Sequence, residues 1–112
     1  MSLSVTIKIQ DDFKLIELDG RILSEADLEK ANRFLDENKI WKLVFDLSKL
    51  QYTNSCGIAF LVKSLTRARI QGGEVIILNV GEGIKKIFEI TKMHEIFPII
   101  ESIHDAKSLF KS

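Results

Sequence analysis

The chain opens with two runs in which apolar and polar residues alternate. The runs read SVTIKIQ, residues 4–10, and FKLIELD, residues 13–19. A period of two places successive side chains on opposite faces and predicts a β-strand for each run. Asp11 and Asp12 separate the runs and are typical turn residues, so we expect the two strands to form a hairpin.

Two later segments carry apolar residues with the period of an α-helix. In the first, Ser24 and Asp27 have the spacing of a helix cap and its acidic partner. The apolar stripe that follows comprises Leu28, Ala31, Phe34 and Leu35. In the second, at about 100° per residue, one stripe collects Ile58, Leu61, Val62, Leu65 and Ala68. The opposite side carries the polar residues Lys63, Arg67 and Gln71, and a Gly-Gly pair at 72 and 73 ends the helix.

The remaining segments predict a layered α/β domain. WKLVFDL (41–47) is apolar on both faces, which favours a central strand covered on two sides, and EVIILNV (74–80) is a second buried strand. FPII (97–100) is a short edge strand, because proline is tolerated only at an edge or a strand start. EGIKKIFEIT and SIHDAKSLF are short helices. The order is therefore ββαβαβαβα in one domain, residues 1–112, with the later strands parallel.

The composition excludes several classes of function. Of 112 residues, 16 are Lys or Arg and 16 are Asp or Glu, which gives a formal net charge of zero. Nucleic-acid binding depends on clustered basic residues, so we do not expect it. One cysteine allows no internal disulfide, the first residues do not form a signal peptide, and no apolar run approaches the roughly 20 residues that span a bilayer. We expect a cytoplasmic protein without direct membrane insertion.

A small polar segment, TNSCG, separates the predicted central strand from the second helix. It runs from Thr53 to Gly57 and contains the only cysteine of the chain, Cys56. In open α/β sheets, ligand and partner sites form where a strand ends and the next helix begins. Asn54 or Ser55 is suited to cap the helix. The same helix start can also host a phosphate on a hydroxyl or activate a thiol, so the residue types leave these roles open.

Catalysis finds little support in the other residue types. A nucleophilic Cys56 needs a base and an orienting group, and His94 and His104 lie in late segments without a motif. Asp46 ends the central strand, and we expect its carboxylate to bond the backbone of its own loop. We therefore expect no enzyme, no metal site and no cofactor.

Phe60 lies off the predicted apolar stripe, near Lys63 and Ser64 and close to the TNSCG segment. One interpretation is an exposed aromatic side chain at a protein interface. The other is a side chain that packs under a neighbouring loop. The sequence leaves both open.

Two long stretches resemble the STAS domain of bacterial anti-sigma factor antagonists. They read LVFDLSKLQYTNSCGIAFLVKSLTRARIQGGEVIILNV and IKKIFEITKMHEIFPIIESIHDA. The resemblance covers nearly the whole chain and implies a mixed, largely parallel sheet with helices packed on it. It also implies a module that binds an ATP-binding partner, both serine kinase and anti-sigma factor, and so frees the sigma factor. Lys92 stands where that family usually has a helix-ending glycine.

In the STAS family the loop usually reads Asp-Ser-Ser-Gly, and the partner phosphorylates the second serine. With Gly57 aligned, Asn54 replaces the aspartate, Ser55 matches the first serine and Cys56 takes the phosphoacceptor position. The resemblance implies a partner-binding loop from Thr53 to Gly57, with Phe60 on the following helix. Phosphorylation is then lost, or shifted to Ser55. The alternative is a STAS subunit of a stressosome-like scaffold or of a lipid or anion transporter complex.

Overall fold

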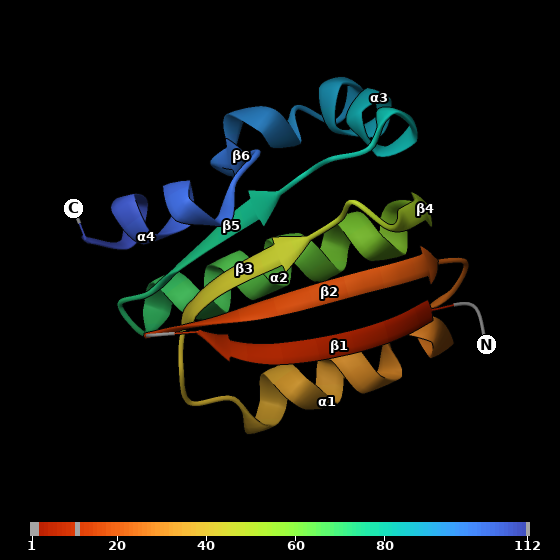
Figure 1. The fold of residues 1–112 in the computed structure, drawn as a ribbon. Coiled ribbons are helices and arrows are strands. Elements are labelled where there is room, and N and C mark those ends of the chain that lie inside the picture. The colour runs from red at the N-terminus through yellow and green to blue at the C-terminus, as the bar shows by residue number, and fades with distance from the viewer. Residues whose placement is uncertain (1–2, 11, 112) are drawn as a thin grey trace.

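The computed structural model describes residues 3–10 and 12–111 as one twisted sheet with helices on both faces (Figure 1). Strands β1 (Leu3–Gln10) and β2 (Phe13–Arg21) pair antiparallel, from Leu3 opposite Gly20 to Gln10 opposite Phe13. The predicted hairpin is therefore confirmed. Asp11, which the sequence placed in its turn, lies outside the described residues.

The later strands are parallel, as predicted. Strands β3 (Lys42–Asp46), β5 (Glu74–Leu78) and β6 (Ile99–Ile100) follow β2 in the sheet order β1-β2-β3-β5-β6. Strand β3 is central, and β6 is an edge strand that begins directly after Pro98. One further strand, β4 (Leu50–Tyr52), pairs with the end of β2 and was not predicted. It has only three residues, two of them exposed, and so shows no recognisable periodicity.

The first predicted helix begins as a 3-10 turn, η1 (Glu25–Leu28), and continues as α1 (Glu29–Glu37). Asp27 acts as the predicted acidic cap partner, because its Oδ2 accepts hydrogen bonds from the backbone N–H groups of Ser24 (3.1 Å) and Leu23 (2.8 Å). The helix buries Ala31 and Leu35 against the sheet.

The second helix, α2 (Ser55–Ile70), ends where the glycine pair predicted. Gly72 adopts a left-handed φ of +80°, its N–H donates to Arg69 O (3.1 Å), and the N–H of Gly73 donates to Ala68 O (2.7 Å). These two bonds form a Schellman motif. The last two α-helices are α3 (Glu82–Ile90), whose N-cap is Gly81, and α4 (Ile103–Lys111).

Two hydrophobic cores hold the layers together. The larger core lies between one face of the sheet and helices α1, α2 and α3, and it includes Leu43 and Phe45 of β3. The smaller core lies on the other face under α4 and includes Val44. Figure 1 shows α3, β6 and α4 gathered beside β5 at one edge of the sheet. Within the described residues, the helices lack the length and apolar composition required to cross a membrane.

The buried face of α2 differs from the predicted stripe. It consists of Gly57, Phe60, Leu61, Ser64, Leu65 and Ala68, whereas Ile58 and Val62 are only half-buried. The sequence misplaced the centre of the stripe because Ser64 is polar. In the structure the hydroxyl of Ser64 is fully buried and donates to Phe60 O one turn earlier at 2.8 Å, so its burial leaves no polar group unpaired.

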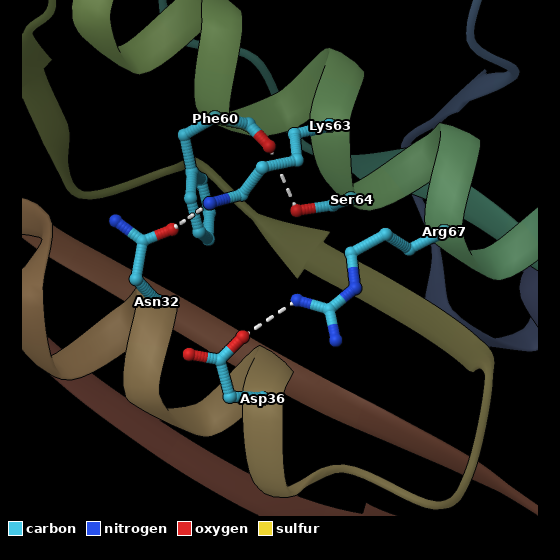
Figure 2. A network of polar contacts seen from close by, with 6 residues as sticks. All are labelled: Asn32, Asp36, Phe60, Lys63, Ser64 and Arg67. Carbon is cyan, nitrogen blue, oxygen red and sulfur yellow. Dashed lines mark hydrogen bonds and ion pairs between the residues drawn. The ribbon is translucent and has the colours of Figure 1, made fainter.

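Two basic residues predicted opposite the apolar stripe of α2 bond side chains of α1 (Figure 2). Lys63 Nζ donates to Asn32 Oδ1 at 2.5 Å, and Arg67 Nη1 pairs with Asp36 Oδ1 at 2.8 Å. The Arg67 guanidinium also lies 5.4 Å from the centre of the Trp41 ring. Lys63 is exposed, as its predicted place opposite the apolar stripe implies, whereas Arg67 is half-buried because the buried face of the helix is rotated from the predicted one.

Candidate functional site

The loop from β3 to α2 begins with a turn held by Asp46. Its Oδ1 accepts a hydrogen bond from the N–H of Ser48 at 2.9 Å, which confirms the predicted structural role of this carboxylate. Strand β4 follows and aligns the chain beside β2, because the N–H of Ile22 donates to Tyr52 O at 2.9 Å. The TNSCG segment therefore leaves a hydrogen-bonded strand and directly enters α2.

Asn54 is the N-cap of α2 and makes two different hydrogen bonds. Its Oδ1 accepts from the N–H of Cys56 at 2.9 Å, which satisfies a donor of the first helical turn. Its Nδ2 donates to Leu23 O at 2.8 Å, across a sequence separation of 31 residues. The sequence left the cap open between Asn54 and Ser55, and the structure selects Asn54. The second bond was not foreseen.

The next two residues of the loop differ in their accessibility. Ser55 is the first residue of α2 and is exposed, whereas Cys56 is half-buried and packs against the larger core. The first turn of α2 contains no acidic residue. The helix therefore brings no carboxylate of its own first turn to the partial positive charge at its start, where Ser55 lies.

Thr53 and Gly57 are buried and hold the loop together. The Thr53 side chain is 2% exposed, and its hydroxyl donates to Asn54 O at 3.2 Å. A Cβ at position 57 would lie 1.9 Å from Thr53 Oγ1 and 3.0 Å from the Cδ1 of Ile22. Only glycine permits this approach of the helix to the loop. These two predicted loop residues therefore support the site and do not present side chains to a partner.

Phe60 is also buried, at 3% exposure, so the interpretation as an exposed interface residue was wrong. Its ring packs edge-on against Phe45 of β3, with the ring centroids 5.8 Å apart. It packs on the sheet and not under a loop, because the rotation of α2 turns position 60 toward the core.

Two apolar side chains beside the loop were missed. Leu23 is 51% exposed, and its carbonyl oxygen accepts the hydrogen bond from Asn54. Tyr52 is 45% exposed and lies two residues before Asn54 in the chain. An apolar residue directly before a helix cap normally packs on the following helix, so the sequence carries no signal that Leu23 is exposed. Tyr52 belongs to the strand that the sequence did not reveal.

The histidines lie on other elements. His94 belongs to η2 (Met93–Glu95), where its Nδ1 lies 3.4 Å from Phe88 O, and His104 belongs to α4. Within residues 3–10 and 12–111, no three His, Cys, Asp or Glu side chains gather into a metal site. An open hollow of about 650 Å³ near the ends of β5 and β6 is lined by Ser48, Asn79, Lys85 and His94 among others, and residues 53–57 do not line it.

Comparison with known proteins places this geometry in a family. The model of the STAS domain matches residues 4–106. A putative anti-sigma factor antagonist, BtrV of Bordetella bronchiseptica, is 28% identical over 71 residues, which are 63% of this chain and 61% of that protein. The chain thus matches less than two thirds of the length of this relative.

Solved structures share the fold at low sequence identity. An anti-sigma factor antagonist from Mycobacterium paratuberculosis superposes with a TM-score of 0.82 at 18% identity, covering 99% of this chain and 96% of the other. The anti-sigma factor antagonist SpoIIAA in its unphosphorylated form superposes with a TM-score of 0.78 at 13% identity, covering 96% of each chain. SpoIIAA of Bacillus in its phosphorylated form superposes with a TM-score of 0.70 at 14% identity, covering 94% of this chain and 97% of the other. The chain therefore belongs to the STAS domain family.

Proposed function

We propose that this protein is an anti-sigma factor antagonist that binds a kinase-type anti-sigma factor and thereby releases the sigma factor. The observation that carries the proposal is the geometry at the start of α2. There Asn54 caps the helix, Ser55 is exposed and Cys56 is half-buried, at the position that the family resemblance aligns with the usual phosphoacceptor. The similarity to BtrV and SpoIIAA supports the same assignment.

The cysteine at position 56 changes how such a complex is regulated. A phosphate group brings roughly −1.5 to −2 charges and three strong acceptor oxygens, enough to disrupt a complementary protein surface. A serine kinase transfers phosphate to a hydroxyl, and position 56 carries a thiol that is half-buried against the core. The protein then binds its partner constitutively at this loop, because the usual modification does not occur.

Ser55 is the alternative phosphoacceptor. Its side chain is exposed at the first position of α2, a helix start whose partial positive charge favours a phosphate and whose first turn contains no acidic residue. Adjacent helix positions differ by about 100° in direction, so a kinase that normally modifies position 56 would have to approach from another side. Phosphopeptide mapping of protein from its native cells distinguishes the two cases: phosphate on Ser55 means a displaced switch, and an unmodified loop means constitutive binding.

A tagged pull-down from the native cells, with mass spectrometry of the bound proteins, tests the proposed function. We expect an ATP-binding anti-sigma factor. With that partner and ATP, a Cys56→Ser variant should acquire phosphate at position 56, while the wild-type chain should not. Recovery of transporter or scaffold subunits in place of an anti-sigma factor, or elution of the pure protein as a large particle, would contradict the proposal and favour the alternative STAS assemblies.

A further inference from the structure

We propose that the hollow of about 650 Å³ near the ends of β5 and β6 is a binding site for a small zwitterion, an α-amino acid with a large apolar side chain. We call it the β5–β6 hollow. The inference goes beyond the proposed function, because residues 53–57 do not line this hollow and its argument involves no anti-sigma factor. It adds a small ligand to a chain whose proposed partner is a protein.

The β5–β6 hollow has the position and the size of a small-molecule site. In open α/β sheets, ligands bind at the carboxyl ends of parallel strands. Strands β5 and β6 end at Leu78 and Ile100, and the N–H of Asn79 donates to Ile100 O at 2.9 Å, which joins the two ends. The volume lies within the range of about 300–1,000 Å³ that is typical of ligand pockets.

The chain leaves β5 through an unusual turn that borders the hollow. Asn79 has a φ of +54°, a left-handed conformation that residues with a Cβ rarely adopt, although asparagine tolerates it better than most. Residues in such conformations cluster at ligand sites. Gly81 also lines the hollow, and a Cβ at this position would find no heavy atom within 4 Å. The turn therefore leaves open space at the start of α3.

Part of the lining is apolar. Phe88 of α3 lines the hollow although it is only 1% exposed, and so lies at its bottom. Val80 and Ile100 are half-buried, and Ile99 is 40% exposed. A ligand that covers these side chains removes apolar surface from water, which favours binding. The fitting ligand therefore has an apolar group.

The charged side chains of the lining define the rest of the ligand. Lys85 and Glu89 come from α3, one helical turn apart, and Glu101 directly follows β6. All three are exposed. Within residues 3–10 and 12–111, the ion pairs include none of these three side chains. One ammonium group and two carboxylates therefore stand at the hollow, and a ligand can bind them without breaking an ion pair between described residues.

A zwitterion complements these charges better than an ion of one sign. Its carboxylate accepts hydrogen bonds from the ammonium group of Lys85, and its own ammonium group donates to Glu89 or Glu101. A phosphate or another anion meets two carboxylates and only one ammonium group, and a cation meets the like charge of Lys85. An α-amino acid with a large apolar side chain carries both charges and the apolar group in one small molecule.

Titration of the isotope-labelled chain with L-leucine, L-phenylalanine and L-tryptophan, followed by two-dimensional NMR, tests the inference. We expect saturable shifts from at least one of them, with a Kd of about 1 mM or tighter and the largest shifts at residues 79–81 and 99–101. The deaminated and the decarboxylated analogues of that amino acid should each bind about tenfold more weakly. For L-phenylalanine these are 3-phenylpropanoate and 2-phenylethylamine.

Variants of the charged residues test their separate roles. Lys85→Gln should weaken binding of the amino acid about tenfold, because the ligand carboxylate loses its charged donor. The double variant Glu89→Gln with Glu101→Gln should weaken it similarly, yet should bind the deaminated analogue no more weakly than wild type does. Lys86→Gln is the matched control, since Lys86 is exposed on α3 and does not line the hollow. The thermal unfolding midpoints should stay close to that of wild type.

Three results would overturn the inference. One is the absence of saturable shifts with all three amino acids, or shifts that lie away from the hollow. The second is binding of inorganic phosphate or of the deaminated analogue at least as tightly as the amino acid, which would indicate an anion site. The third is unchanged affinity in both Lys85→Gln and the glutamate double variant. None of these results alters the proposed function, which the pull-down tests separately.

Discussion

The ring of Phe60 packs edge-on against the ring of Phe45, with centroids 5.8 Å apart and planes at 86°. This contact joins α2 to the central strand β3 directly behind the candidate docking loop. Edge-to-face aromatic pairs add to the stabilisation that burial alone provides. The helix that presents Asn54, Ser55 and Cys56 is therefore anchored to the middle of the sheet.

Replacing Phe60 by alanine should destabilise the whole fold. Removal of a buried phenylalanine costs about 3–5 kcal/mol through lost burial and the cavity left behind. Urea unfolding followed by circular dichroism measures the free energy of unfolding. Phe60→Leu is the control, and we expect it to cost clearly less because most of the volume remains. A Phe60→Ala variant with wild-type stability would contradict the packing described above.

Gly57→Ala should destabilise the loop because its new Cβ meets Thr53 Oγ1 at 1.9 Å. Overpacking of this kind costs about 1–3 kcal/mol. A second substitution, Thr53→Ala, removes the obstructing hydroxyl. The double variant should therefore lose less stability than the sum of the losses in the two single variants. A double-mutant cycle by chemical denaturation measures this coupling. Strict additivity would mean that the two residues do not meet.

Lys92→Gly should raise stability. Lys92 has a φ of +59°, a left-handed conformation that costs a residue with a Cβ roughly 1 kcal/mol and costs glycine almost nothing. The thermal unfolding midpoint should rise accordingly. Lys86→Gly, in the interior of α3, is the control and should lower stability by about 1 kcal/mol. Equal losses for both variants would argue against strain at Lys92.

The ion pair between Arg67 and Asp36 should contribute only modestly. Its side chains are 35% and 71% exposed, and exposed pairs are worth about 0.2–1 kcal/mol. A double-mutant cycle with Arg67→Met and Asp36→Asn should give a coupling in this range that shrinks in high salt. Arg67→Met alone should lower the free energy of unfolding more than Asp36→Asn does, because the guanidinium also packs over Trp41. The reverse order would refute the stacking contribution.

Local patterns determined most of the secondary structure. The alternation of residues 4–10 and 13–19 was sufficient for the hairpin, and the glycine pair was sufficient for the end of α2, because only a residue without a Cβ adopts the φ of +80° at Gly72 easily. The turn at Asp46 was also predictable, since an aspartate bonds the backbone two residues ahead within its own loop. Each of these features depends on residues that are neighbours in the chain.

Tertiary structure decided the surface of the site. The orientation of α2 depends on a buried Ser64 that periodicity counts as polar, and this placed Phe60 in the core. Strand β4 exists only because β2 lies beside it. The bond from Asn54 to Leu23 joins residues 31 positions apart, and no local pattern contains such a pair. The sequence by itself thus determined most of the elements and the family resemblance, whereas long-range packing decided which side chains beside the loop are exposed.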